Sequence, residues 1–426
     1  MTQQDDYLRP FTQTTTNKQN KIRTFLLGFS LLILLIGCSP QAEETIPQDT
    51  NDTPTQTAIP AEPTATAPVP TPTAIKPTPI SQSDLDIYLD ALVEAGFAGS
   101  ILVTQHGETL INDAYGLADI ANELPITTAT VFDSGSLSKQ FTAAAILQLQ
   151  EQRLLELDDT LADYFDDVPE DKASITIHQL LTHTSGLPGY VYNGDFEETS
   201  RDEAQAMAFQ AELVTEPGTE HLYSDTGYGL LAIIVELVSG QDFTTYLHDN
   251  LFTPAGMEST GFYNDPRWNK LTVANGYFNG EDFGTAATRP GPYWGLLGFG
   301  GVLSTTGDFY KWGESLKNHT ILAKESVDKL FTPYVQEFED GDSYYGYGWA
   351  VLDHEEYGRV IFHDGATDSQ NAVMIMVEKE DTVIIVMSNQ IEESATNETF
   401  YGTDTGFALG ISLLSGDYST LPDYAQ

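Results

Sequence analysis

The chain has 426 residues, of which 18 are Lys or Arg and 63 are Asp or Glu, so its formal net charge is −45. Hydrophobic residues make up 41% of the sequence, which is enough apolar material for a core and excludes a wholly disordered chain. The acidic balance argues against nucleic-acid binding, because such binding needs clustered Lys and Arg along the phosphate path. Cys38 is the single cysteine, which excludes an intramolecular disulfide framework and a cysteine-rich metal site.

The N-terminal segment 1–38 is typical of a signal peptide rather than of a folded element. A polar stretch with basic residues precedes an apolar run from Phe25 to Gly37, which is too short for a comfortable transmembrane helix. The segment ends in Leu-Ile-Gly-Cys38, which resembles a bacterial lipobox, where the cysteine is modified with diacylglycerol and becomes the new N-terminus. We therefore expect an extracytoplasmic, membrane-anchored bacterial lipoprotein. The alternatives are an ordinary signal peptide and an anchor helix that is never cleaved.

Residues 39–83 differ abruptly in composition, because these 45 residues contain 10 of the 21 prolines and 10 threonines. Such a stretch cannot bury enough apolar surface to order itself. Proline favours extended conformations, so the segment could reach on the order of 100 Å. We expect a disordered tether that holds a folded domain away from a membrane. A ligand for a proline-binding module is the weaker alternative.

The folded domain is expected to span 84–426 and to carry most of the charge. Its 13 basic and 56 acidic residues leave a net charge of −43. Solubility, or adaptation to high salt or to acid outside the cell, would each account for this acidity. A dense carboxylate surface also repels anionic polymers and attracts cations.

The first half of the domain predicts one strand pair and two helices. Residues 98–115 indicate two strands around a turn at Gly107. Residues 137–152 have helical spacing, and 226–239 predict a buried helix that ends at Gly240.

The second half of the domain predicts mainly strands. We expect them at 347–352, 359–363, 371–377 and 382–388, followed by a closing helix at 405–415. Strands thus lie at both ends of the domain, with helices and long loops between them. This order predicts an α/β fold in which the two ends build one sheet, helices cover it, and a helical segment is inserted.

Ser136-Leu-Ser-Lys139 is the first group of residues that suggests chemistry. Ser136 is expected in the first turn of a helix, where unpaired amide groups and the helix dipole favour developing negative charge. Lys139 lies three residues further on, so it shares that face and could accept the hydroxyl proton or assist another base. Ser-x-x-Lys alone is a weak signal, and a surface serine is its alternative.

Two further motifs follow in the chain, Tyr223-Ser-Asp225 and His363-Asp-Gly365. In this order and spacing, the three motifs resemble those of the serine β-lactamase and DD-peptidase superfamily. The resemblance is to the branch that holds class C β-lactamases, D-alanyl-D-alanine carboxypeptidases and related esterases. The stretches 180–188 and 298–305 agree with it, and it covers about 95–390. It implies a β-lactamase/transpeptidase-like α/β fold, an antiparallel sheet flanked by helices with a helical insertion subdomain.

The resemblance implies roles for three catalytic residues. Ser136 would be the nucleophile that forms an acyl-enzyme, and Lys139 the cation or base beside it. Tyr223 would be the general base for acylation and the acid for the leaving group. A free phenol has a pKa of about 10, so Tyr223 would work near neutrality only beside a positive charge, for which Lys139 is the candidate. A core aromatic residue with a satisfied hydroxyl is the alternative for Tyr223.

The third motif would bind the substrate. The backbone amides of Ser136 and Ala366 would form the oxyanion hole, and Gly365 would let the strand approach the substrate closely. His363 stands where many β-lactamases have lysine. It could bind a substrate carboxylate when protonated, pass protons when neutral, or be merely structural. His183 is expected, with the threonine after it, to shape a turn near the site rather than to act in catalysis.

Two departures from the family pattern bear on the substrate. Asp225 stands where the family usually has Asn; an amide can donate a hydrogen bond to a substrate carbonyl, whereas an ionised carboxylate cannot. Asp225 could instead pair with Lys139 and hold it charged. His363 in place of lysine makes a fixed positive charge for a β-lactam carboxylate less certain. Both departures favour ester hydrolysis.

The expected function is that of a serine hydrolase which acts through an acyl-enzyme on an ester or a D-amino-acid peptide, of esterase or D-alanyl-D-alanine carboxypeptidase type. The alternatives are a β-lactamase and a non-catalytic or slowly acylated penicillin-recognising binding or sensor lipoprotein. No cofactor is expected, and the seven histidines other than His363 show no metal spacing. The expected partners are a small-molecule, peptide or ester substrate and a membrane reached through a lipid on Cys38. The protein is expected to be a monomer.

Overall fold

The computed structural model describes residues 82–339, 341–355, 357–393, 398–419 and 421–425. The predicted lipidation site Cys38 and the predicted tether up to residue 81 lie outside the described residues. The first described element is helix α2 (Gln82–Glu94), which the sequence analysis did not predict.

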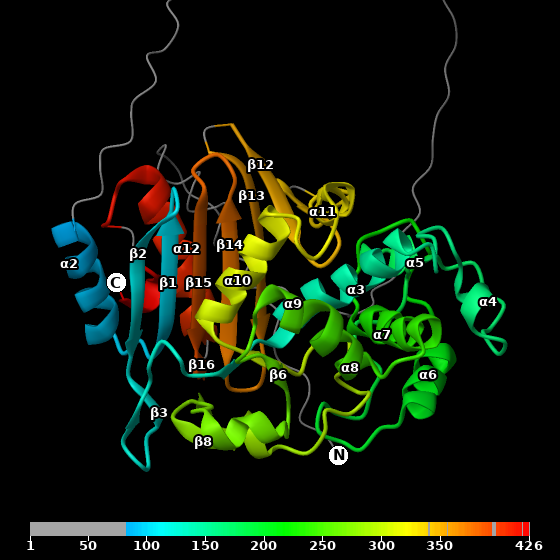
Figure 1. Ribbon diagram of the computed structural model, residues 1–426, viewed down its shortest axis with the longest axis horizontal. Helices are drawn as coiled ribbons and strands as arrows, with labels where there is room; N and C mark the ends of the chain where they lie inside the picture. The colour runs from blue at the N-terminus through cyan, green and yellow to red at the C-terminus, as the bar shows by residue number, and fades with distance from the viewer. Residues whose placement is uncertain (1–81, 340, 356, 394–397, 420, 426) are drawn as a thin grey trace, which may run out of the picture.

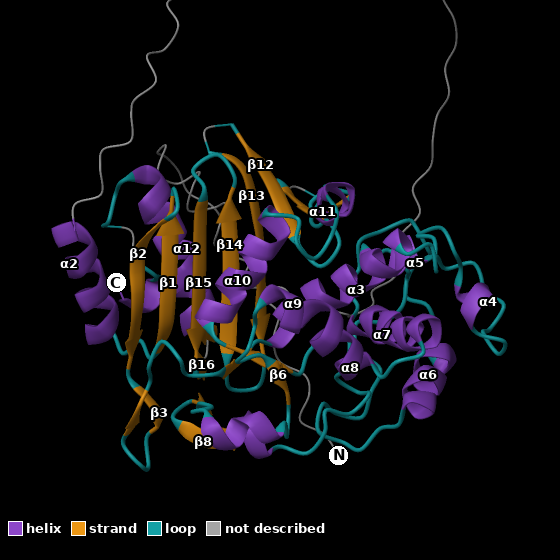
Figure 2. Ribbon diagram, viewed as in Figure 1, coloured by secondary structure: helices purple, strands orange, loops and turns teal. Residues whose placement is uncertain are grey.

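An antiparallel sheet of eight strands forms the left-hand part of the domain in the view of Figures 1 and 2. In chain order, its strands are β1 (Gly99–Gln105), β2 (Glu108–Tyr115), β10 (Val335–Gln336), β11 (Ser343–Tyr345), β12 (Ala350–His354), β13 (Gly358–Ala366), β14 (Asn371–Val377) and β15 (Thr382–Ser388). Their spatial order is β10-β11-β12-β13-β14-β15-β1-β2. The two ends of the domain meet where β1 pairs with β15, with Ile101 opposite Val386. The prediction of one sheet built from both ends is therefore confirmed.

Helices cover both faces of this sheet, and a helical segment is inserted between its two groups of strands (Figure 2). The longer helices are α3 (Lys139–Glu151), α6 (Arg201–Gln210), α7 (Asp225–Ser239), α10 (Thr306–Lys317), α11 (Lys324–Leu330) and α12 (Tyr401–Ser415). The shorter ones are α4 (Leu161–Tyr164), α5 (Ile177–Leu181), α8 (Phe243–Leu247) and α9 (Thr253–Ala255). Helices α4 to α9 make up the predicted helical insertion.

Short strands form three smaller sheets around the main one. They are β3 (Leu117–Asp119) with β4 (Leu124–Pro125); β5 (Phe132–Asp133), β9 (Val302–Ser304) and β6 (Gly261–Phe262); and β17 (Glu398–Phe400), β16 (Gln390–Glu393), β7 (Asn275–Phe278) and β8 (Glu281–Thr285). The β5–β9 pair matters for function, because β5 leads directly into the turn that carries Ser136.

The alternation of side chains along the central strands divides the core into two parts. Ile101, Val373 and Val386 face α2 and α12 on one side of the sheet. Leu102 and Met374 face α3 and α10 on the other side, where most of the buried residues lie. Because successive strand residues point to opposite faces, these runs of apolar residues bury both faces of the sheet.

Two predicted elements begin three or more residues from where the structure has them, and each difference has a cause in tertiary contacts. The strand expected at 347–352 begins at Ala350 instead, because Gly348 has a φ of +73° and its backbone presses against that of Lys139. The closing helix begins at Tyr401 rather than at 405. The Asn371 side chain, on β14, accepts hydrogen bonds from the first amides of this helix, at 2.6 Å from the nitrogen of Gly402. Such a cap from another element leaves no local sequence signal.

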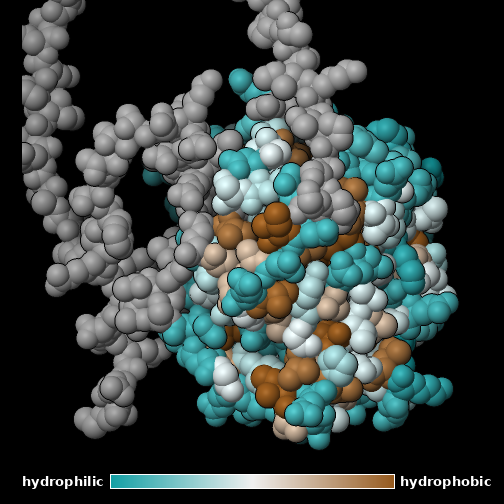
Figure 3. All heavy atoms as spheres, turned by 90° about the vertical axis from the view of Figure 1, so that its left-hand side faces the viewer, coloured by the Kyte–Doolittle hydropathy of each residue, from teal (hydrophilic) through white to brown (hydrophobic). Residues whose placement is uncertain are grey.

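The outer face formed by α2 and β2 mixes apolar and hydrophilic side chains (Figure 3). On α2, Ile87 and Val93 are exposed beside acidic residues. Among the described residues, no single helix is long and apolar enough to cross a membrane; α7 and the segment 243–255 meet that criterion only as a pair bent by 79°.

Helix α12 places three glycines at four-residue intervals against the sheet. An added Cβ on Gly406 would lie 2.2 Å from Cγ1 of Val373, a branched side chain with little freedom to move. At Gly410 the nearest atom would be 3.5 Å away, which is ordinary contact.

We therefore predict opposite effects for two glycine substitutions in α12. Gly406→Ala should lower the free energy of unfolding by about 1–3 kcal/mol, because overpacking outweighs the gain in helix propensity. Gly410→Ala should be neutral or stabilising by up to about 1 kcal/mol. Urea unfolding followed by circular dichroism measures both, and equal effects would contradict the described packing.

Candidate active site

Ser136 lies in a 3₁₀ turn, η1 (Gly135–Ser138), rather than in the first turn of the α-helix that follows. Gly135 has a φ of +52°, and an added Cβ there would lie 2.7 Å from the nitrogen of Ala366. Only glycine allows this conformation and this approach without strain. The turn therefore holds Ser136 against the end of β13.

Lys139 extends from the first residue of α3 to Ser136. Its side chain is fully buried, and its Nζ donates a hydrogen bond to Oγ of Ser136 at 3.0 Å. The same nitrogen lies 2.7 Å from Oδ1 of Asp225, at the start of α7, and 3.4 Å from the carbonyl oxygen of Phe299. The pairing of Asp225 with Lys139 that the sequence suggested is thus present. One ammonium connects three separate parts of the chain.

The surroundings of Lys139 act on its protonation in opposite directions. Burial lowers the pKa of Lys139 by penalising the ammonium form, while the Asp225 carboxylate favours that form. Burial is the larger effect, so the pKa lies below its usual value. A lysine with a lowered pKa is better suited to accept a proton from Ser136 than an exposed one.

Tyr223 lies over Lys139, with Nζ 4.6 Å from the centre of its ring. Although 36% of the residue is exposed, its hydroxyl is buried. Burial and the Asp225 charge raise the pKa of Tyr223 well above its usual value, and a hydrogen bond with Ser136 only partly opposes this rise. We expected Lys139 to favour the phenolate, but these directions keep Tyr223 protonated at neutral pH.

His183 supports the Tyr223 loop from behind. It has a φ of +57°, as expected for a residue that shapes a turn, and its Nδ1 accepts a hydrogen bond from the backbone nitrogen of Ser224 at 3.0 Å. Its ring lies 4.3 Å from that of Tyr223. Burial lowers the pKa of His183 well below its usual value, so the imidazole is neutral and acts by packing and hydrogen bonding.

The end of β13 brings a second backbone amide close to the nucleophile. An added Cβ on Gly365 would lie 2.3 Å from the carbonyl oxygen of Ser134 and 2.6 Å from the nitrogen of Ser136. This close approach explains the glycine of the third motif. Ser136 and Ala366 both line the same cavity, which agrees with the predicted oxyanion hole.

His363 is buried, with 5% of its surface exposed. Its Nδ1 lies 2.5 Å from the carbonyl oxygen of Asp364, so it must donate there, and Nε2 accepts from the Tyr345 hydroxyl at 3.0 Å. Burial, together with the Lys139 charge, lowers the pKa of His363 to about 3. A protonated His363 that binds a carboxylate does not match this environment, which leaves the neutral and structural alternatives.

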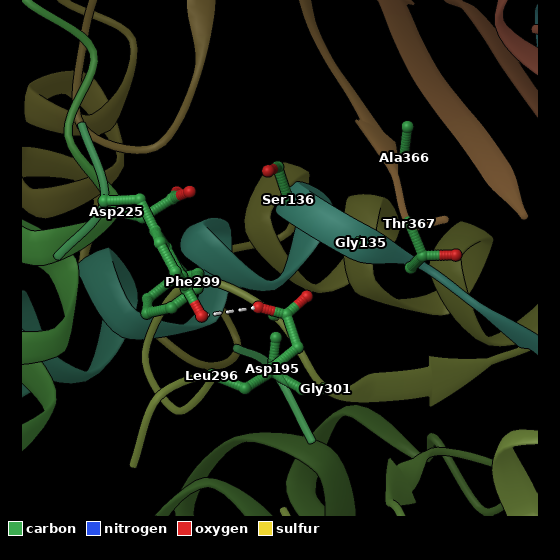
Figure 4. Close-up of a pocket in the computed structure, with 11 residues that line it drawn as sticks. Gly135, Ser136, Asp195, Asp225, Leu296, Phe299, Gly301, Ala366 and Thr367 are labelled. Carbon is green, nitrogen blue, oxygen red and sulfur yellow. Dashed lines mark hydrogen bonds between the residues drawn. The ribbon is translucent and has the colours of Figure 1, made fainter. Parts of the chain in front are cut away.

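A cavity of 280 Å³ opens beside Ser136 (Figure 4). Its lining adds residues that the sequence analysis did not assign to the site: Tyr190, Asp195, Leu296, Phe299, Gly300, Gly301 and Thr367. Phe299, Gly300 and Gly301 lie in the stretch 298–305, which resembles the family but was assigned no role in the site. No sequence pattern indicates Asp195, because it lies in a loop outside the motifs. No cluster of three or more His, Cys, Asp or Glu side chains suited to a metal occurs in the described part of the chain.

The fold and the Ser136–Lys139 pair together define a serine hydrolase with a β-lactamase fold. The Beta-lactamase family model matches residues 89–402, and the chain belongs to this family. The chain is 30% identical over 298 residues to a putative penicillin-binding protein PbpX of Bacillus subtilis, covering 70% of this chain and 72% of the relative. It is 29% identical over 323 residues to penicillin-binding protein 4* of the same organism, covering 70% and 69%.

Solved structures show the same fold. A penicillin-binding protein homologue from Pyrococcus abyssi superposes with a TM-score of 0.69 at 26% identity, covering 80% of this chain and 79% of that one. A D-amino acid amidase from Ochrobactrum anthropi superposes with a TM-score of 0.66 over 80% of this chain and 99% of that one. At 22% identity, this second similarity concerns the fold alone.

The Lys139–Asp225 contact makes a prediction about the pH dependence of Ser136. Asp225→Asn removes the charge that raises the pKa of Lys139, so the acid limb of Ser136 reactivity should move to lower pH by about one unit or more. The measurement is the rate at which an arylsulfonyl fluoride labels Ser136 between pH 4 and 9. This range of about five pH units covers the fall in rate expected when a lysine with a lowered pKa becomes protonated.

Asp90→Asn is the matched control, because Asp90 is an exposed residue of α2 and loses the same charge. Its labelling profile should coincide with that of the parent. An acid limb of Asp225→Asn that stays in place, or moves to higher pH, would contradict the coupling.

Proposed function

We propose that the protein hydrolyses carboxylic esters or D-amino-acid peptides through an acyl-enzyme on Ser136, with esters as the better substrates. One observation carries the proposal: Nζ of Lys139 lies 3.0 Å from Oγ of Ser136 and 2.7 Å from Oδ1 of Asp225. A base within hydrogen-bonding distance of a hydroxyl and oriented by a third group is the arrangement that activates a serine nucleophile.

In the acylation step, the neutral form of Lys139 accepts the proton of Ser136 while Oγ bonds to the substrate carbonyl carbon. Asp225 stabilises the ammonium that forms. The amides of Ser136 and Ala366 donate to the carbonyl oxygen as it becomes negative. The bond to the leaving group then breaks, and the leaving oxygen takes a proton from Lys139 through the hydroxyl of Tyr223.

In deacylation, Lys139 and Tyr223 act as they do in acylation, and a water molecule takes the place of Ser136 as the nucleophile. Water gives its proton to Lys139 through Tyr223 and attacks the acyl carbon. The bond between that carbon and Oγ of Ser136 then breaks, the acid product leaves, and Lys139 returns the proton to Oγ. A Tyr223 that remains a phenol suits this relay, because a hydroxyl both donates and accepts. The raised pKa of Tyr223 thus changes its proposed role from the initial base to a proton relay.

Two features favour esters over β-lactams and peptides. Asp225 offers only acceptor oxygens, which cannot donate a hydrogen bond to a carbonyl of the substrate, and it already pairs with Lys139. His363 is neutral and buried, so it supplies no charge for a β-lactam carboxylate. The relatives named penicillin-binding proteins keep the peptide and β-lactam alternatives within the test.

We further propose that the enzyme is a monomeric bacterial lipoprotein, acylated at Cys38 and held outside the cytoplasm by the 39–83 tether. The Leu-Ile-Gly-Cys38 sequence after an apolar run supports the lipid attachment.

The test of the function compares initial rates on a short-chain aryl ester, a chromogenic cephalosporin and a D-Ala-D-Ala peptide. The ester should be hydrolysed fastest, and Ser136→Ala should lower that rate at least about a thousandfold, because it removes the nucleophile. Ser415→Ala, at the exposed end of α12, is the matched control and should keep the parental rate.

Two results would count against the proposal. Ester hydrolysis by Ser136→Ala at the parental rate would remove Ser136 from the mechanism. Faster turnover of the cephalosporin or the peptide than of the ester would show that Asp225 and His363 do not set the substrate preference.

A further inference from the structure

The charges that line the cavity beside Ser136 are of one sign. Asp195 and Asp225 are the only ionisable carboxylates in the lining, and none of the described lining residues is Lys, Arg or His. In Figure 4, the two carboxylates approach the cavity from different elements, Asp225 beside Ser136 and Asp195 near Gly301. They are close enough for the charge of Asp225 to raise the pKa of Asp195.

The two carboxylates differ in their partners. Asp225 is paired with the buried Lys139 at 2.7 Å. Asp195 accepts a hydrogen bond from the Tyr190 hydroxyl at 3.0 Å and makes no ion pair with any Lys, Arg or His in the described part of the chain. Arg289, whose charge also acts on Asp195, is engaged with Asp368 at 3.4 Å and lies over the ring of Phe196.

Asp195 therefore carries a charge that the protein itself does not pair. Burial, with further contributions from Asp225 and Asp368, raises the pKa of Asp195, because these surroundings disfavour its ionised form. A cation bound in the cavity would reverse this penalty. The surrounding domain acts in the same direction, because its net charge of −43 attracts cations and repels anions.

The proposed acyl-enzyme indicates whether the acyl part or the leaving group of the substrate reaches Asp195. The acyl part stays bonded to Ser136 through both steps, while the leaving group departs after the first. We therefore place the group that reaches Asp195 on the acyl part, which remains beside this cavity throughout the reaction. The cavity volume of 280 Å³ limits that group to a short chain.

We propose that the enzyme selects substrates whose acyl part carries a protonated amine close to the scissile carbonyl, and that Asp195 binds this amine. This inference rests on the proposed acyl-enzyme at Ser136 and specifies its substrate class. Tyr190 holds the carboxylate of Asp195 in place through its hydrogen bond. Anionic acyl groups meet two carboxylates and no lining cation, so they are disfavoured.

The test uses three 4-nitrophenyl esters of similar length: the 3-aminopropanoate, the butanoate and the malonate half-ester, which are positive, neutral and negative. In the parent protein, kcat/KM for the cationic ester should exceed that for the neutral ester by about tenfold, as expected for one charge-assisted hydrogen bond. The anionic ester should be the slowest. A cationic ester that is no faster than the neutral one would overturn the proposal.

Asp195→Asn identifies the residue responsible, because it removes the charge and keeps an oxygen that can accept from Tyr190. The ratio of the cationic to the neutral rate should fall by about tenfold. Asp90→Asn, with the same charge change on exposed α2, should leave the ratio as in the parent. Equal ratios in Asp195→Asn and the parent would overturn the role of Asp195.

The outcome separates this inference from the function on which it depends. Hydrolysis of the neutral butanoate that requires Ser136, without any preference for charge, would overturn the inference and leave the hydrolase intact. If none of the three esters were hydrolysed faster than by Ser136→Ala, the proposed function itself would fail. The ratio in the parent decides the matter even if Asp195→Asn does not fold.

Discussion

The burial of the Lys139 ammonium against Ser136 and Asp225 is the contact on which the rest of the site depends. An unpaired buried charge costs several kcal/mol, so the ammonium form of Lys139 is stable in its fully buried position because Asp225 lies 2.7 Å away. Asp225 is the first residue of α7, and Lys139 is the first residue of α3. The ion pair therefore connects the starts of two core helices, and the hydrogen bond to Ser136 attaches the nucleophile to the same point.

The neighbouring residues hold the contact between Lys139, Ser136 and Asp225 in place. Gly135 and Gly365 let the nucleophile turn and β13 approach closely, so the amides of Ser136 and Ala366 lie at one cavity. Behind Tyr223, His183 is neutral because burial lowers its pKa. Neutral aromatic and imidazole rings exclude water without adding charge, which leaves Lys139 and the carboxylates to determine the electrostatics. Next to a buried group such as Lys139, each remaining charge has a larger effect on its neighbours than in water.

Local sequence patterns predicted the long strands of the main sheet, three of the helices and the nucleophile with its partners, but not helices α2, α6, α10 and α11. The apolar runs at 371–377 and 382–388 and the apolar stretch 226–239 predicted elements within a few residues of those in the structure. The three motifs identified Ser136, Lys139 and Asp225, which the structure brings together. Asp195 could not be found this way, since a lone aspartate in a loop becomes part of the site only through the folding of distant segments. The start of α12 was missed for the same reason, because its cap comes from Asn371 on another element.

The protonation states were the least accessible part of the site from sequence. A motif shows that Tyr223 and His363 are near a lysine, and a positive neighbour alone would favour phenolate. The structure adds burial, and the Asp225 carboxylate beside the lysine, which together raise the pKa of Tyr223 and keep the phenol protonated. For His363, burial lowers the pKa to about 3 and removes the charge that a lysine would have supplied there.

The role of Lys139 as the base is tested most directly by the burst of 4-nitrophenol that is released when the enzyme is mixed rapidly with a 4-nitrophenyl ester. The comparison is between the parent and the double variant Lys139→Met with Asp225→Asn, which removes the ion pair without leaving either charge buried alone. The acylation rate should fall by about a thousandfold in the double variant, as expected for the loss of a general base. Thermal unfolding should show that the variant remains folded. An acylation rate within about tenfold of the parent, in a folded variant, would contradict the central role of Lys139.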